Sequence, residues 1–214
     1  MTTVITGANG RLARYLAASF APTSDLIMVD RETSSRPLPP NATWHTADLT
    51  DEAAVTALFQ EIAAAVPSID VLIHTVGNWD GRPFVDTSLE DWNNVMHVNL
   101  QTAFLCFREA CRHMQDKGGC LIGVTSGQGA DRGVAQQAAY SAAKAGVMRL
   151  VEAVAAEFQD PQIRAHAIAP SMILYDGMED QAGVRAQDLA DACQFLVSPV
   201  GGALNGQVMR VYGG

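Results

Sequence analysis

Short apolar runs alternate with segments of helical spacing along the whole chain of 214 residues. The runs that predict strands are residues 3–6, 25–30, 43–46, 69–77, 119–125, 163–169 and 206–212. The segments that predict helices are residues 11–20, 51–66, 88–115, 138–158 and 187–198. Strands separated by helices are typical of a parallel sheet, because each helix carries the chain back across one face of the sheet. We therefore expect an α/β fold in a single domain over residues 1–214: a doubly wound parallel sheet of about seven strands with helices on both faces.

A glycine-rich turn joins the first predicted strand to the first predicted helix. The sequence TGANGRLA, residues 6–13, places glycines at 7 and 10. Gly7 allows a tight turn, and Gly10 lets the backbone approach a pyrophosphate at the start of the helix. This pattern between a strand and a helix favours a dinucleotide site over an ordinary turn.

An acidic residue follows the second predicted strand. Asp30 can hydrogen-bond the adenosine ribose and repel a 2′-phosphate, so we expect NAD as the cofactor. Three arginines, Arg11, Arg31 and Arg36, keep NADP open, because a neighbouring arginine could hold the 2′-phosphate instead.

A tyrosine and a lysine lie one helical turn apart in AAYSAAKAGV, residues 138–147. Positions four apart share a helix face, so Lys144 can serve Tyr140. A nearby ammonium favours the phenolate, and we expect it to lower the pKa of Tyr140. Taken alone, the pair is also what an ordinary surface helix produces by chance.

Composition narrows the possible partners. The net charge of −9 disfavours nucleic acid and anionic membranes, since both select a basic face. The four cysteines form no C-x-x-C pair, the histidines have no zinc-ligand spacing, and we expect no metal. No apolar segment is long enough for a transmembrane helix, and the first residues, MTTVITGANG, lack a signal region. We expect a cytoplasmic protein.

Further motifs complete an ordered series along the chain. After TGANGRLA come ADLTD (47–51), HTVG (74–77), HVNL (97–100), VTSGQG (124–129), YSAAK (140–144), IAPSMI (168–173) and LNGQVMRVYGG (204–214). Taken together and in this order, they resemble the short-chain dehydrogenase/reductase family over essentially the whole chain. The resemblance implies a Rossmann fold and an oxidoreductase that interconverts an alcohol and a carbonyl by hydride transfer to or from NAD(P).

The resemblance also implies residue roles. Tyr140 would be the general acid–base, Lys144 would support it and hold the nicotinamide ribose, Ser126 would bind the substrate oxygen, and Asn99 would anchor a proton-relay water. The implied cofactor-binding residues are Gly7, Asn9, Gly10, Arg11, Leu12, Asp30, Arg31, Asp48, Leu49, Val76, Gly77, Tyr140, Lys144, Pro170 and Ile173. We expect His74 to be a packing residue, and Asn78, Trp79, Phe84 and Gln128 are candidates for the substrate pocket.

One departure from the family concerns the substrate side. Residues 175–186 are shorter than the family's usual lid, which predicts a more open site. A dinucleotide-binding regulator or scaffold with little turnover is therefore the alternative function. Apolar residues on more than one face of helices 88–115 and 138–158 predict a homodimer or homotetramer.

Overall fold

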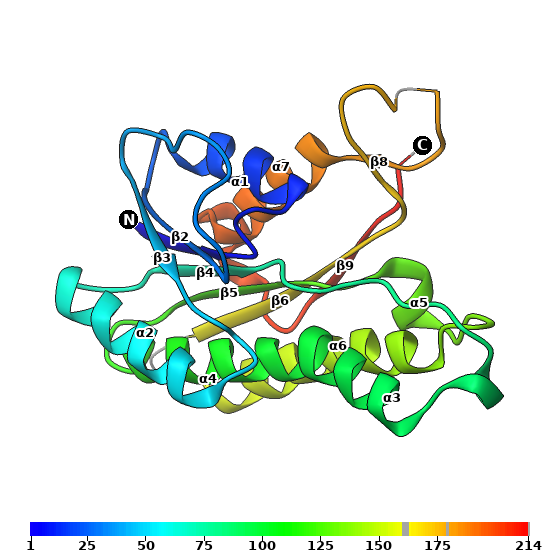
Figure 1. The fold of residues 1–214 in the computed structure, drawn as a ribbon. Helices are drawn as coiled ribbons and strands as arrows, with labels where there is room; N and C mark the ends of the chain where they lie inside the picture. Colours follow the sequence, from blue (N-terminus) through cyan, green and yellow to red (C-terminus); the bar gives the residue numbers. More distant parts are fainter. Residues whose placement is uncertain (160–162, 179, 214) are drawn as a thin grey trace.

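Seven parallel strands form one sheet in the computed structural model, which describes residues 1–159, 163–178 and 180–213 (Figure 1). The strands are β1 (Thr2–Thr6), β2 (Asp25–Asp30), β3 (Ala42–Thr46), β4 (Val71–His74), β5 (Gly119–Val124), β6 (Ile163–Pro170) and β9 (Val208–Val211). Each coincides with a run that the sequence predicted. The expected fold class is confirmed.

The order of the strands creates one reversal. The order is β3-β2-β1-β4-β5-β6-β9, so the chain winds outward from β1 and then returns to place β4 on the other side of β1. Thr6 is level with Val29 of β2 and with His74 of β4. In open sheets of this kind, ligands bind beyond the carboxyl ends of the strands at the reversal. We therefore expect a ligand site at the segments that follow β1 and β4.

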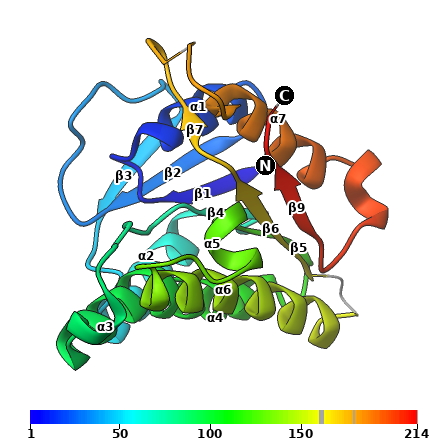
Figure 2. The same cartoon turned by 90° about the vertical axis from the view of Figure 1, so that its right-hand side faces the viewer.

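Helices cover both faces of the sheet. Helices α1 (Arg11–Phe20) and α7 (Ala186–Val197) lie on one face, and α2 (Glu52–Ala65), α4 (Thr102–Met114) and α6 (Ala138–Glu157) lie on the other (Figure 2). Each layer encloses an apolar core, one around Leu16, Phe20 and Leu189, the other around Phe59 and Phe107. These cores hold the strand ends in fixed positions.

The segment predicted as one helix over 88–115 is divided. It consists of α3 (Leu89–Met96), a π-helical turn η2 (His97–Gln101) and then α4. Ser88 begins α3 with a capping box, because its hydroxyl accepts from Asp91 N and the Asp91 carboxylate accepts from Ser88 N. The wider turn contains Asn99, which is buried. Single π-helical turns are frequent at functional sites.

Short elements at the carboxyl edge differ from the prediction. Residues 126–137, to which the sequence assigned neither a strand nor a helix, contain the helix α5 (Gly127–Asp131), which Ser126 caps by accepting from Gly129 N at 3.3 Å. A small separate sheet pairs β7 (Ile173–Leu174) with β8 (Val184–Arg185). Between them the described residues form no helix, and Glu179 of the predicted short segment lies outside the described residues. Two short 3₁₀ turns complete the fold, η1 (Phe84–Asp86) and η3 (Val200–Ala203).

Several polar side chains lie inside the cores. His74 is buried and its two ring nitrogens contact Thr6 Oγ1 at 2.8 Å and Thr102 Oγ1 at 3.1 Å, as expected for a packing residue. His166 is also buried, and neither ring nitrogen has a hydrogen-bond partner within the described structure. All four cysteines are buried free thiols. Among the described residues, no helix has the length and apolar character needed to span a membrane.

Candidate active site

The turn after β1 has the geometry that the glycines predicted. Gly7 has φ +73°, and a Cβ there would lie 2.7 Å from Thr75 Oγ1 and 3.2 Å from Val76 N. A side chain at this position would therefore be strained and would strike the segment after β4. Gly10 N donates to Gly7 O at 2.9 Å, which closes the turn before α1 begins at Arg11. The start of α1 thus presents free backbone N–H groups at the reversal of the sheet, where a phosphate group fits.

Asp30, at the end of β2, is tied to this turn. One carboxylate oxygen accepts from Asn9 N at 2.9 Å, and the other accepts from Arg31 N at 2.8 Å. The carboxylate is half-buried and fixed in position beside the cleft. Of the three arginines that kept NADP open, only Arg31 lines the cleft, and its guanidinium is 3.7 Å from Glu32.

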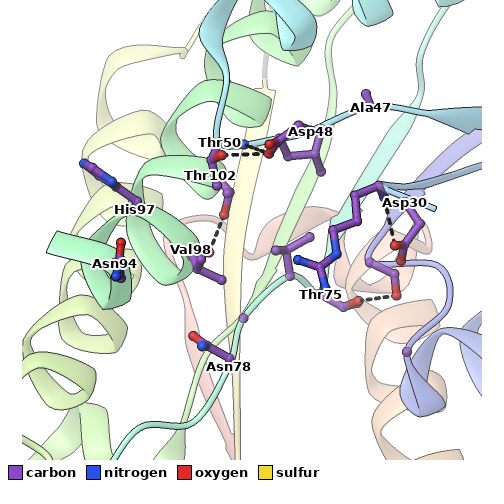
Figure 3. A pocket seen from close by; sticks show the side chains of 16 residues that line it. Asp30, Ala47, Asp48, Thr50, Thr75, Asn78, Asn94, His97, Val98 and Thr102 are labelled. Carbon is purple, nitrogen blue, oxygen red and sulfur yellow. Dashed lines mark hydrogen bonds between the residues drawn. The ribbon is translucent and has the colours of Figure 1, made fainter. Parts of the chain in front are cut away.

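A cleft of about 580 Å³ opens between the ends of β1, β2 and β4 (Figure 3). Eight of the predicted cofactor residues line it: Gly7, Gly10, Asp30, Arg31, Asp48, Leu49, Val76 and Gly77. Asp48 Oδ1 accepts from Thr50 N at 2.9 Å and from Thr50 Oγ1 at 2.7 Å. These hydrogen bonds lower the pKa of Asp48, so it is a carboxylate at neutral pH. The cleft offers room, a glycine turn and an acidic ribose partner, and these features fit a dinucleotide.

The remaining predicted cofactor residues lie outside this cleft. Leu12 is buried in the core between α1 and the sheet. Asn9 faces the segment after β2, and its side chain bonds Thr33 O and Ser35. Pro170 ends β6, and Ile173 lies in β7. Tyr140 and Lys144 lie on α6, toward the end of β5.

Arg11 takes part in a contact that the sequence did not predict. Its guanidinium lies over the Tyr175 ring, 4.0 Å from the centroid. Next to it, Asp176 accepts from Arg14 and from the Tyr15 hydroxyl, both at 2.6 Å. The segment after β7 is thereby fastened onto α1. The side chains of Tyr175 and Asp176 therefore lie across the first turns of α1.

The π-helical turn brings Asn99 to the lysine. Asn78 N donates to Asn99 Oδ1 at 3.1 Å, and Asn99 Nδ2 donates to Asn78 Oδ1 at 2.9 Å and to Val95 O at 3.1 Å. A Cβ at Gly77 would lie 2.6 Å from Lys144 Nζ and 2.7 Å from Asn99 Oδ1. Gly77 therefore leaves the space in which these two groups approach each other. Full burial lowers the pKa of Lys144 to about 8.

Tyr140 and Ser126 meet at the start of α5. A Cβ at Gly129 would lie 3.3 Å from both Ser126 Oγ and the Tyr140 ring, so this glycine leaves room for the pair. Lys144 Nζ lies 5.8 Å from the centre of the Tyr140 ring. Four residues from three parts of the chain are thus gathered beyond the carboxyl ends of β4 and β5: Asn99, Ser126, Tyr140 and Lys144.

The expected lowering of the phenol pKa is wrong in this structure. Burial raises the pKa of Tyr140 above 10.0, and only the hydrogen bond with Ser126 opposes that rise. Removing the phenolate from water costs more than the neighbouring hydroxyl recovers.

Three supporting residues were missed or only partly recognised. Thr75 Oγ1 donates to Thr6 O at 2.7 Å and borders Gly7. Thr125 Oγ1 donates to Lys144 O at 2.7 Å and fixes the lysine-bearing turn of α6 to β5. Asn78 was a candidate for the substrate pocket, yet its side chain bonds Asn99. Thr75 and Thr125 lie near the ends of the predicted strands 69–77 and 119–125, and Asn78 directly follows the first of them. These places were the available signal, but no pattern revealed the partners of the three residues.

Of the other pocket candidates, Gln128 alone lines a cleft near α5. Its volume is about 590 Å³, and its walls include Ser171, Met172 and Tyr212. Trp79 and Phe84 are exposed, at 66% and 74%.

Comparison with known proteins assigns the family. Residues 28–214 match the family model described as enoyl-(acyl carrier protein) reductase. The cis-4-hydroxycyclohexanecarboxylate dehydrogenase of Sinomonas cyclohexanicum is 33% identical over 192 residues, covering 81% of this chain and 76% of that protein. The chain belongs to the short-chain dehydrogenase/reductase family. It is an NAD(P)-dependent enzyme of that family, which confirms the resemblance drawn from the motifs.

A further relative and two solved structures are also similar to this chain. The meso-2,3-butanediol dehydrogenase of Serratia marcescens is 25% identical and covers 99% of this chain and 92% of its own length. Among solved structures, ElxO with NADP bound has a TM-score of 0.90 at 20% identity, covering 98% of this chain and 96% of its own. Levodione reductase has a TM-score of 0.89 at 24% identity, covering 100% and 96%. These two structures share the fold.

Proposed function

We propose that this short-chain dehydrogenase/reductase interconverts an alcohol and a carbonyl by hydride transfer, with Tyr140 as the general acid–base. The observation that carries the proposal is the gathering of Asn99, Ser126, Tyr140 and Lys144 beside the cleft that begins at the glycine turn. A bound nicotinamide supplies the hydride acceptor in oxidation and the hydride donor in reduction.

The four side chains divide the proton chemistry among them. In oxidation, Tyr140 first releases its own proton to the relay, and its phenolate oxygen then takes the proton of the substrate hydroxyl while the carbinol carbon gives up its hydride to the nicotinamide. The Ser126 hydroxyl donates to the substrate oxygen and stabilises the charge that develops there. Lys144 would hold the nicotinamide ribose, and Asn99 anchors the water that relays protons to Lys144.

Burial gives Lys144 a useful intermediate basicity. With its pKa lowered to about 8, the amine remains mostly protonated at neutral pH and can still release its proton to water. The raised pKa of Tyr140 suits the reduction direction, because it keeps the phenol protonated and carbonyl reduction requires an acid that donates a proton.

We propose NAD(H) as the preferred cofactor. The fixed Asp30 carboxylate lies where it would bond the ribose hydroxyls and repel a 2′-phosphate. Asp48 and Leu49 would border the adenine. NADP(H) is the alternative through Arg31, and ElxO, which shares the fold, is known with NADP bound.

We also propose a homodimer or homotetramer through α4 and α6. Most apolar residues that the sequence marked on these helices are covered within the chain, including Leu105, Phe107 and Val151. Phe104 is 45% exposed and borders a shallow apolar surface with Met96, Leu100, Gly146 and Leu150. A second copy related by a two-fold axis would cover this surface with its own equivalent.

The test of the proposed reaction is a change in nicotinamide absorbance with a panel of small alcohols, ketones and aldehydes. A matched Ser126→Ala variant should lose turnover with every substrate that the wild type accepts. If the wild type binds the dinucleotide but turns over none of the panel, the alternative of a dinucleotide-binding regulator or scaffold gains support.

A further inference from the structure

A segment that follows β2 is fastened onto the glycine turn. We call residues Glu32–Arg36 the strap. Trp44 Nε1 donates to Glu32 O at 3.1 Å and holds one end. Asn9 holds the middle, because its Nδ2 donates to Thr33 O at 3.1 Å and its Oδ1 accepts from Ser35 N and Oγ, each at 3.0 Å. Loops of this composition are usually free at the surface, whereas this one is bonded at each step.

Arg36 holds the other end of the strap. Its Nη2 donates to Ala8 O at 2.5 Å and to Gly10 O at 3.0 Å. The two carbonyls belong to the turn that carries Gly7 and Gly10. One guanidinium therefore bridges the strap and both sides of the turn.

These bonds fix the direction of two peptide groups. In a trans peptide, the C=O and the N–H point in opposite directions. In the Ala8–Asn9 peptide, Arg36 binds the carbonyl and Asp30 binds the N–H. In the Gly10–Arg11 peptide, Arg36 binds the carbonyl, so the Arg11 N–H points away from the strap at the first position of α1. Free N–H groups at this position are the ones that bind a phosphate.

The charge beside the glycine turn also favours the binding of an anion. The groups around Arg36 are Arg14, which repels its charge, and Asp30, which stabilises it. Burial lowers the pKa of Arg36, yet no ordinary shift removes the charge of a guanidinium at neutral pH. A fixed positive charge therefore lies behind the turn.

We propose that Arg36 is a positioning residue that holds the glycine turn in the shape that binds the cofactor diphosphate. It acts through the carbonyls of Ala8 and Gly10 and does not hold a 2′-phosphate. This inference rests on the proposed use of a nicotinamide dinucleotide. It predicts that Arg36 contributes equally to the binding of NADH and NADPH.

The experiment measures dissociation constants for NADH and NADPH, by fluorescence of the reduced nicotinamide and without turnover. Arg36→Met should weaken both cofactors by the same factor, roughly tenfold to a hundredfold for the loss of charged hydrogen bonds. Arg36→Lys should recover part of that loss, because one ammonium reaches fewer carbonyls. The control is Arg185→Met, which breaks two comparable bonds to Asp188 away from the cleft and should leave both constants unchanged.

The outcomes separate the two roles of an arginine near the ribose. A loss confined to NADPH would overturn the proposal, because it would make Arg36 a ligand of the 2′-phosphate. Unchanged binding of both cofactors would overturn it as well. If Arg36→Met does not fold, the comparison of Arg36→Lys with wild type decides by the same two criteria. A wild type that binds neither cofactor would instead refute the proposed function, and this inference with it.

Discussion

Acidification from pH 7 to pH 5 should destabilise this protein through two buried histidines, His74 and His166. Burial lowers the pKa of His74 to about 3 and of His166 to about 4, against 6.5 for an exposed histidine. Above pH 6.5 both states are neutral and the histidines have no effect. As the pH falls below 6.5, the unfolded chain binds protons that the folded chain refuses, so stability is lost.

The size of this loss in stability depends on the histidine pKa in the unfolded chain, because both pKa values in the folded chain lie below 5. At pH 5 the solution lies about 1.5 pH units below the pKa of an exposed histidine, so each histidine stabilises the unfolded chain by about 2 kcal/mol. The two histidines together stabilise it by about 4 kcal/mol. This is a large part of the free energy of unfolding of a typical domain, about 5–15 kcal/mol.

Urea unfolding of the wild type and of His166→Leu at the two pH values tests this reasoning. Carboxylates titrate equally in both proteins, so the difference isolates His166. The variant should lose about 2 kcal/mol less than the wild type between pH 7 and pH 5. Leucine also removes two ring nitrogens that have no partner within the described structure, so the variant should be no less stable at pH 5. An identical loss in the two proteins would show that His166 is protonated or solvated in the folded state, and would refute the argument.

Three further expectations follow. Gly7→Ala should weaken dinucleotide binding and lower the melting temperature, because φ at Gly7 is +73° and the new Cβ would lie 2.7 Å from Thr75 Oγ1. The matched control is Gly133→Ala, because a Cβ at Gly133 would have no atom within 4 Å. Equal behaviour of the two variants would contradict the assigned turn. Dissociation constants should be lower for NAD(H) than for NADP(H), and Asp30→Ala should narrow the gap; tighter NADP(H) binding by the wild type would reverse the assignment. Light scattering should give a mass at least twice 22.8 kDa, and a Leu150→Arg substitution should reduce it; a wild-type monomer would show that the α4–α6 surface is exposed in solution.

The sequence predicted the sheet well because the buried strands are built around short apolar runs. Central strands of a parallel sheet are covered on both faces, as Val4, Leu72 and Ile122 are here, and such runs stand out from their neighbours. The two-residue strands β7 and β8 are too short to show any periodicity. The helix α5 was missed because the glycines at 127 and 129 read as a loop, and its start depends on the cap that Ser126 provides.

The site was predicted at the level of motifs and missed at the level of contacts. Gly7 and Gly77 come from two of the ordered motifs and Asp30 from the end of the second predicted strand, and the structure brings the three to one cleft. Sequence spacing carries no information on burial, and burial decides that the pKa of Tyr140 is raised and not lowered. It also carries none on long-range partners. Arg36 was only one of three candidate arginines in the sequence, and its bonds to the glycine turn appear only in three dimensions.

The most direct test of the proposed mechanism compares Tyr140→Phe with the wild type in both turnover and cofactor binding. The variant should lose redox turnover, because phenylalanine cannot exchange a proton, while the dissociation constant for NADH stays within a few fold. A Lys144→Ala variant measured alongside should lose both, since the lysine is proposed to act on the proton and on the ribose. Near-normal turnover of Tyr140→Phe on any substrate of the wild type would contradict the assignment of Tyr140 as the general acid–base.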